Sequence, residues 1–252
     1  MKNTKLYVIC LIFICISALI FYVYKWEYRE KTLDVNFFSL NRGRSVFIRT
    51  PNNKTILVGG GQNSEAIREI TKVMPFYKRK IDYVIIPGAV PAQIGGLIEI
   101  VERYEIEEII MPSLMATSTV LSELKKVIKK NKIHIKEVER GDEIKVGEVS
   151  IKILFPYEGF KYNKTSLPEL GIELNYKNTG VFLIGNLSKT IQKDIAKSFE
   201  IKTEENIVEY YNSASKTKVS DELLEKIKPK FTFSTNEKTM YLISDGDGWA
   251  KK

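Results

Sequence analysis

The chain is poor in the residues that build metal centres. Among its 252 residues there is one histidine, His134, and there are two cysteines, Cys10 and Cys15, both near the N-terminus. Zinc sites are built from His, Cys and carboxylates, and a hydrolase that holds two metal ions needs several imidazoles converging on one cleft. A single imidazole excludes a centre of that kind. Because no cysteine follows Cys15, the sequence also gives no sign of a disulfide.

The lone histidine lies in the segment Ile133-His134-Ile135-Lys136, in which apolar and polar residues alternate as they do in a strand. An isolated histidine is ordinarily a packed or surface residue rather than a metal ligand. We therefore expect a structural role for His134, and the sequence predicts no metal and no other cofactor.

Charge is absent between Leu6 and Tyr24. As a helix rising ~1.5 Å per residue, this segment would be about 28 Å long, close to the hydrocarbon thickness of a bilayer. Tyr7 and Trp26 place amphipathic rings near its two ends, where lipid headgroups would lie. The pattern predicts an N-terminal tail, a transmembrane anchor in contact with lipid and a juxtamembrane linker, at residues 1–5, 6–24 and 25–32.

A cleavable signal peptide is the alternative interpretation of this segment. Signal peptides have a shorter apolar core, roughly 7–15 residues, followed by small residues at a cleavage site. Here the bulky residues 21–24 follow, so we expect the segment to be retained. Basic residues flank it on both sides, at Lys2 and Lys5 and at Lys25 and Arg29, so the positive-inside rule does not choose an orientation.

The remainder, residues 33–252, has a length typical of one α/β domain. The whole chain has a net charge of +8, of which five basic and two acidic residues up to Lys31 supply +3, leaving +5 on the domain. This surplus permits binding to a polyanion without requiring it. The densest basic patch is a candidate polyanion contact or an ordinary solvated helix end, and it comprises Lys125, Lys126, Lys129 and Lys130.

Strand and helix patterns alternate along this domain. Strands are expected at 33–40, 45–49, 55–58, 83–86, 106–111, 133–138, 143–146, 149–155, 172–176, 180–184, 207–211, 231–234 and 240–243. Helices are expected after Asn63 or Ser64 to Val73, over 93–104, from a Thr117 or Ser118 cap to Lys130, and over 187–199 and 220–227. Two successive halves of strands with outer helices are what a four-layer αββα sandwich needs.

Six short motifs occur in the order found in one known family. Residues 33–45 lie where that family has a strand followed by V-G-Q-G-D-A, and residues 48–61 resemble its I-x-T-P-x-G-K-x-x-L-I-D-G-G hairpin. Ile94-Gly95-Gly96-Leu97 matches its I-G-G-L, and residues 163–167, 182–187 and 212–217 resemble N-N-x-S-L, F-L-L-T-G-D-I and H-H-G-S-x-x. The chain thus resembles the metallo-β-lactamase-fold domain at the C-terminus of the competence protein ComEC, a membrane DNA-uptake protein, and its stand-alone relatives.

The resemblance implies a hydrolase fold from which the metal ligands have been lost. The family's T-H-x-H-x-D-H loop corresponds to a stretch in which its His, His, Asp and His positions hold Gly88, Val90, Ala92 and Gln93. Its other ligand positions hold Gly59, Asn186, Asn212 and Ser213. Glycine, valine and alanine supply no side-chain ligand atoms, and neutral amides concentrate positive charge poorly. Without a metal-bound hydroxide the fold has no evident nucleophile.

Three local patterns offer weaker alternatives. Ser213, Ser215 and Lys216 are the elements of Ser-Lys catalysis, but adjacent residues on an extended segment point to opposite faces. Residues 244–248 contain two Asp-Gly pairs, which are typical of a turn rather than of a cation loop. The glycines at 59–61 lack the lysine of a phosphate-binding loop and predict a backbone turn.

The sequence therefore predicts a single-pass membrane pseudoenzyme whose domain lies outside the cytoplasm, a placement that follows partly from the resemblance. It would act as a binding or scaffold module for a protein partner at the membrane. A protein that binds DNA or an anionic wall polymer is the first alternative. A hydrolase that works without metal is the second, and it would need one Ser or Asp whose replacement abolishes turnover.

Overall fold

The computed structural model describes residues 2–27, 31–113, 117–160, 169–210, 219–234 and 238–252, with backbone only for 2–6, 8–9 and 23–27. The chain divides into two compact units, Met1–Lys31 and Thr32–Lys252. The first unit holds one helix, α1, from Lys2 to Glu27.

Helix α1 contains the predicted anchor at residues 6–24. A helix that crosses a bilayer needs about 20 consecutive, mostly apolar residues. In the part of the chain that the structure describes, no helix combines that length with that apolarity. The transmembrane anchor at residues 6–24 stays a prediction.

The second unit begins with a mixed sheet of eight strands. Its order is β14-β13-β1-β2-β3-β4-β5-β6. Strands β3 to β6 run parallel, and the others pair antiparallel. The strands are β1 Leu33–Ser39, β2 Arg44–Arg49, β3 Thr55–Val58, β4 Lys80–Ile85, β5 Glu105–Pro112, β6 His134–Val138, β13 Met240–Ser244 and β14 Trp249–Lys251, and the helices between them are α2 Glu65–Val73, α3 Pro91–Arg103 and α4 Thr119–Lys130.

The second sheet has six strands in the order β12-β11-β10-β9-β8-β7. Strands β10, β11 and β12 run parallel, and helices α5 and α6 connect them. The strands are β7 Glu143–Val146, β8 Val149–Phe155, β9 Gly171–Tyr176, β10 Thr179–Gly185, β11 Glu205–Tyr210 and β12 Phe231–Ser234, and the helices are α5 Lys189–Ser198 and α6 Asp221–Ile227.

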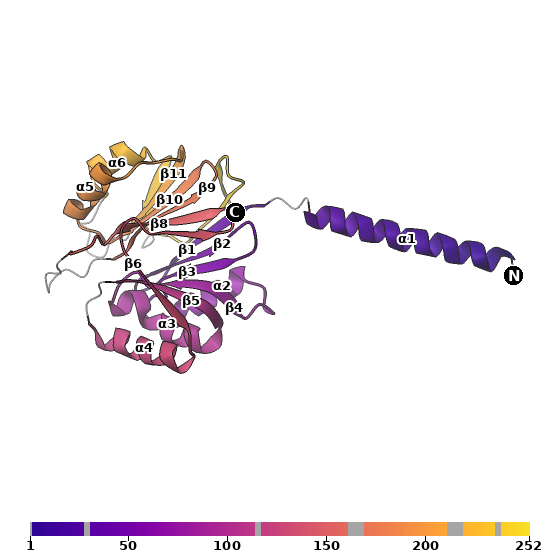
Figure 1. Ribbon diagram of the computed structural model, residues 1–252, viewed down its shortest axis with the longest axis horizontal. Coiled ribbons are helices and arrows are strands. Elements are labelled where there is room, and N and C mark those ends of the chain that lie inside the picture. The colour runs from indigo at the N-terminus through magenta and orange to yellow at the C-terminus, as the bar shows by residue number, and fades with distance from the viewer. Residues whose placement is uncertain (1, 28–30, 114–116, 161–168, 211–218, 235–237) are drawn as a thin grey trace. The chain divides into compact units, whose positions relative to one another are not determined.

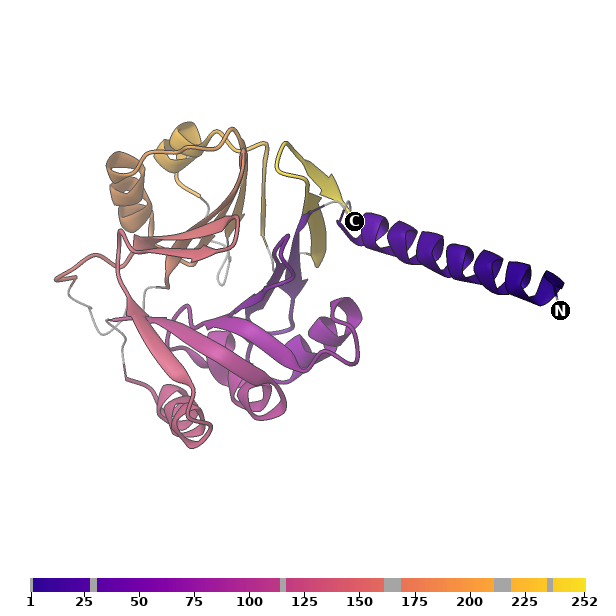
Figure 2. The same ribbon diagram turned by 45° about the vertical axis from the view of Figure 1, so that its right-hand side comes forward.

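The two sheets pack face to face with helices on both outer sides (Figure 1). Alternate residues of β1 show how this arises, because Val35 and Phe37 enter the core between the sheets while Phe38 joins the core beneath α2, α3 and α4. Phe37 meets Phe233 of the other sheet edge to face, with ring centroids 4.6 Å apart. A third cluster lies beneath α5 and α6. Seen from a second side, the same helices again cover the outer faces (Figure 2). This agrees with the predicted α/β sandwich of four layers.

Most predicted elements occur within a few residues of their expected bounds. Helix α3 begins at Pro91 rather than at residue 93, because proline is well tolerated in the first turn. Helix α4 begins after Ser118, whose hydroxyl accepts a hydrogen bond from the Leu121 amide at 3.2 Å. Strand β14, three residues at the sheet edge, was not predicted from the sequence.

Candidate functional site: a buried arginine between two carboxylates

Arg44 begins β2, directly after the turn that joins it to β1. The turn requires glycine at position 43, where φ is +94° and a Cβ would lie 1.6 Å from the Ala92 carbonyl oxygen. The start of α3 therefore lies against this turn. The close approach brings the loop with the predicted degenerate positions next to Arg44.

The Arg44 side chain is almost fully buried and pairs with two carboxylates. Its Nη2 lies 2.7 Å from Glu169 Oε2, and its Nη1 lies 2.6 Å from Glu209 Oε2. Glu169 and Glu209 are also buried, with 3% and 0% of the side chain exposed. Burial opposes the charge of the guanidinium, but the carboxylates of Glu209 and Glu169 outweigh it and raise the pKa of Arg44 above its ordinary value. Arg44 is therefore a fixed cation.

Loops from both sheets meet at this ion cluster. Gly185 ends β10, immediately before Asn186, and a Cβ on it would lie 2.2 Å from Glu169 Oε2 and 2.4 Å from Arg44 Nη2. On the other side, the amide of Leu170, next to Glu169, donates a hydrogen bond to the Pro87 carbonyl at 2.6 Å. Pro87 precedes Gly88. The guanidinium thus lies between the segments that the resemblance assigns to metal ligands.

The structure brings three of the predicted degenerate positions together. A Cβ on Gly88 would lie 2.3 Å from Gln93 Oε1, so the amide of Gln93 occupies the space beside Gly88. A Cβ on Gly59 would lie 3.3 Å from the Gln93 carbonyl and 3.2 Å from that of Arg44. Val90 caps α3, and Ala92 lies against Gly43. Asn186 is exposed, and Asn212 and Ser213 lie outside the described residues.

Two polar atoms at this site lack hydrogen-bond partners among the described residues. They are Gln93 Oε1 and Arg44 Nε, and both are buried. One is an acceptor and the other a donor, so a bound water or a small polar group is the ordinary way to satisfy them.

These residues do not fit the two metal ions of the hydrolase family. Within the described residues there is no group of three or more His, Cys, Asp or Glu side chains arranged to hold a metal. The two carboxylates at the site are already paired with Arg44, whose positive charge would repel a metal ion. His134 lies elsewhere, on the exposed side of β6, with its Nδ1 3.0 Å from Glu108 Oε1. This surface position agrees with the structural role expected for it.

The sequence patterns did not predict the ion cluster of Arg44, Glu169 and Glu209. Arg44 occupies the position of the Asp in the family's V-G-Q-G-D-A motif, so this reversal of charge was a signal that could have been found. Glu169 and Glu209 had no such signal, because they are 125 and 165 residues from Arg44 along the chain.

The other predicted positions lie away from this site. Lys125, Lys126, Lys129 and Lys130 are exposed on α4, whose buried side is formed by Leu121, Leu124 and Ile128. Residues 245–248 form the turn between β13 and β14, in which Asp245 Oδ1 accepts hydrogen bonds from the amides of Asp247 and Gly248. The turn interpretation is therefore confirmed. Ser213, Ser215 and Lys216 lie outside the described residues.

Comparison with known proteins identifies the fold. No protein-family profile and no curated protein sequence matches the chain. Solved structures do match: the metallo-β-lactamase fold protein YhfI from Bacillus subtilis has a TM-score of 0.55 and 12% identity, covering 81% of this chain and 86% of YhfI. Human tRNase Z, short form, has a TM-score of 0.52 and 10% identity, covering 81% and 92%.

A larger enzyme contains a similar domain. CmlA, a diiron β-hydroxylase from Streptomyces venezuelae, has a TM-score of 0.53 and 15% identity, with 81% of this chain matched. The match covers only 45% of CmlA. At these identities the likeness concerns the fold alone. The chain from Thr32 onward therefore has the metallo-β-lactamase fold.

Proposed function

We propose that this protein is a pseudoenzyme of the metallo-β-lactamase fold, in which the Arg44 guanidinium has replaced the metal ions and the domain acts by binding. The observation that supports this proposal is the buried pairing of Arg44 with Glu169 and Glu209, at 2.7 and 2.6 Å, beneath the loops of Gly88 and Gly185. Among the described residues no group of three or more His, Cys, Asp or Glu side chains is arranged there to hold a metal, and a permanent cation is present.

The replacement preserves charge balance without preserving the chemistry. Two buried carboxylates require positive charge nearby, and a guanidinium supplies it with two directed hydrogen bonds. A metal ion also lowers the pKa of bound water and so generates a nucleophile near neutral pH. A guanidinium stays protonated and does not coordinate water in this way. The cluster then holds the loops together while hydrolysis is lost.

Metal analysis of the purified full-length protein tests this proposal. After growth with added zinc and manganese, we expect both metals far below one ion per chain, and no metal-dependent hydrolysis of a phosphodiester such as bis-p-nitrophenyl phosphate. The variant His134→Gln serves as a control, because it removes the surface imidazole as a source of adventitious metal. Stoichiometric zinc or manganese, together with phosphodiesterase activity that Gln93→Ala abolishes, would contradict the proposal.

Kinship with the ComEC domain and a protein partner at a membrane are further parts of this proposal. They are supported by the order of the six motifs and by the uncharged segment Leu6–Tyr24 in the sequence. Crosslinking in intact cells that express the tagged full-length protein tests them together. One dominant captured protein is the expected result, and capture of nucleic acid or wall polymer alone would contradict it.

Polyanion binding is the second candidate function. Lys125, Lys126, Lys129 and Lys130 are exposed on α4 and form no ion pair within the described part of the chain. If they bind DNA, affinity falls steeply as salt rises, and charge reversal at these four positions removes that dependence. Equal affinity before and after charge reversal would reject this candidate.

A further inference from the structure

The turn that leads from α2 into β4 carries two exposed aromatic rings at its tip. The amide of Lys78 donates a hydrogen bond to the Pro75 carbonyl at 2.9 Å, which closes a turn with Phe76 and Tyr77 at its two central positions. Phe76 is 87% exposed and Tyr77 is 76% exposed, and their rings meet edge to face with centroids 5.6 Å apart. We call residues 75–78 the aromatic turn.

Exposed rings of this kind are uncommon in the second unit. Among its described residues, Tyr157 is the one other large apolar residue that is exposed, at 36%, and it packs against Phe155 and Phe160. Single exposed apolar residues are ordinary, but two adjacent rings at the tip of a turn gain no burial unless another surface covers them. The aromatic turn therefore has the chemistry of a contact surface.

The domain holds both flanks of the aromatic turn. Met74, directly before it, is buried in the core beneath α2, α3 and α4. At the other flank, Lys78 Nζ donates a hydrogen bond to the Asn53 carbonyl at 2.9 Å, and β4 begins at Lys80. The rings thus project from a fixed base, so covering them costs little conformational entropy.

A permanent positive charge lies beside the rings. Lys78, Arg79 and Lys80 follow Tyr77 directly. Lys80 pairs with Glu107 at 2.7 Å, and burial lowers the pKa of Lys78 below its ordinary value. Arg79 is exposed and forms no ion pair within the described part of the chain, and a guanidinium stays charged at physiological pH. Its charge is therefore available to an anionic surface.

The aromatic turn lies at the end of the sheet where the chain enters the second unit. In the sheet register, Asp34 pairs with Arg49 and Arg49 with Thr55, while Ile56 pairs with Tyr83. Strands β1, β3 and β4 therefore begin at the same end, which we call the entry end. Because neighbouring strands lie ~4.8 Å apart, the starts of β1 and β4 are roughly 14 Å apart.

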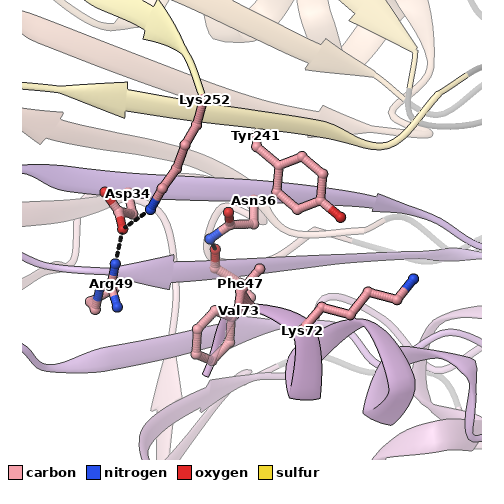
Figure 3. Close-up of a pocket in the computed structure, with 8 residues that line it drawn as sticks. All are labelled: Asp34, Asn36, Phe47, Arg49, Lys72, Val73, Tyr241 and Lys252. Atoms are coloured by element: carbon pink, nitrogen blue, oxygen red, sulfur yellow. Dashed lines mark hydrogen bonds and ion pairs between the residues drawn. The ribbon is translucent and has the colours of Figure 1, made fainter. Parts of the chain in front are cut away.

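Two other basic residues at the entry end are held within the domain. Arg49 and Lys252 both donate to Asp34 Oδ2, Lys252 at 3.2 Å (Figure 3). Asp34 is itself buried. These ion pairs close the end of the sheet, and they leave the two rings and Arg79 as the groups free to meet another surface.

The exposed area favours a membrane over a protein partner. Two aromatic side chains bury roughly 300–500 Å² together. A stable protein interface takes roughly 800 Å² from each partner. A bilayer interface needs no matching surface, because it accepts a few rings singly at headgroup level and attracts basic residues when it contains anionic lipid.

We propose that the aromatic turn docks on a membrane surface that contains anionic lipid. Phe76 and Tyr77 enter the interface, and Arg79 contacts lipid phosphate. The contact uses residues of the second unit alone, so it is separate from the lipid contact predicted for residues 6–24.

This docking turns the Arg44 cluster away from the lipid. Ser39 pairs with Arg44 at the far end of β1 and β2, five residues from the pair of Asp34 and Arg49. At ~3.3 Å per residue, the cluster is roughly 17 Å from the entry end. The loops around the cluster then stay accessible to a partner in solution.

Fluorescence of the full-length protein on vesicles tests this docking. The chain has two tryptophans, Trp26 and Trp249, and the Trp249 indole donates to the Glu205 carbonyl at 2.9 Å, so it is held within the domain. Trp26→Phe gives a reference protein, and adding Phe76→Trp places an indole at the tip of the turn. On vesicles of phosphatidylcholine and phosphatidylglycerol with brominated acyl chains, we expect quenching of the Phe76→Trp emission and little change in the reference. Equal quenching of the two proteins, or none, would overturn the proposal.

Charge variants of the Phe76→Trp protein test the requirement for anionic lipid. Arg79→Glu shifts the docking equilibrium about fivefold or more toward the free turn, since each basic residue near such a surface contributes on that order. Lys126→Glu makes the same charge change on the exposed side of α4 and is the matched control, for which quenching stays unchanged. Urea unfolding checks that both variants remain folded. Quenching that is the same in Arg79→Glu and its parent, or on vesicles without phosphatidylglycerol, would contradict the proposal.

Discussion

The domain buries charge at two places, and it does so in opposite ways. At the first, Arg44 lies within hydrogen-bonding distance of both Glu169 and Glu209, at 2.7 and 2.6 Å. In the second, Glu173 of β9 is fully buried opposite Lys152 of β8, but the closest approach of their charged atoms is 3.9 Å, and neither Glu173 oxygen has a hydrogen-bond partner among the described residues.

Geometry, rather than burial, distinguishes these two sites. Burial alone favours the neutral form of a carboxyl group, and it raises the pKa of Glu173 above its ordinary value although the Asn175 side chain and then Lys152 oppose the shift. At the other site two short hydrogen bonds keep the guanidinium charged despite full burial. Mutation of each site therefore has a different expected effect on stability.

The largest effect is expected for Arg44→Met. The substitution leaves Glu169 and Glu209 buried without their cation, and removing one partner of a buried ion pair typically costs about 3–5 kcal/mol. Urea unfolding at neutral pH measures the loss. Arg103→Met is the control, because Arg103 forms an exposed pair with Glu99 one helical turn away, and such pairs contribute about 0.5 kcal/mol or less. Equal losses in the two variants would mean that the cluster does not stabilise the fold.

A smaller loss is expected for Glu209→Gln. Glutamine retains an oxygen that accepts from Arg44 Nη1, but the hydrogen bond loses its charge assistance while Glu169 still neutralises the guanidinium. A hydrogen bond to a charged group contributes about 1.5–3 kcal/mol, and part of this remains. The same urea titration measures it. A variant as unstable as Arg44→Met would show that both carboxylates are required together.

Sequence patterns predicted the local features of the fold, such as single strands, but not the long-range ion pairs of Arg44. Strands β7 and β8 occur at the expected residues because their alternation is local. Gly59 and Gly88, which the resemblance assigned to one site with Gln93, both lie close to Gln93. The partners of Arg44 depend on which loops of two different sheets meet, and no local pattern specifies that. Strand β14 was missed because three residues are too few for a periodic signal.

The smallest effect is expected at Glu173, with the opposite sign. Since its pKa is raised in the folded state, its favourable contribution is present at pH values below the ordinary value of 4.5 and is lost as the pH rises through the folded-state pKa. Glu173→Gln replaces the carboxyl group by a neutral amide, so the variant does not lose stability as the pH rises. At about pH 8 we therefore expect its free energy of unfolding to exceed that of wild type by roughly 1 kcal/mol, and the difference shrinks as the pH approaches 4.5.

Glu143→Gln is the matched control for this measurement, because the Ser150 hydroxyl donates to Glu143 and lowers its pKa. A lowered pKa contributes stability above the ordinary value that is lost as the pH falls, so this variant is less stable than wild type at about pH 8 and approaches it under acid conditions. Urea unfolding of both variants at several pH values separates the two signs. If Glu173→Gln is also less stable at about pH 8, then Lys152 pairs with Glu173 despite the separation, and the two sites bury charge in the same way.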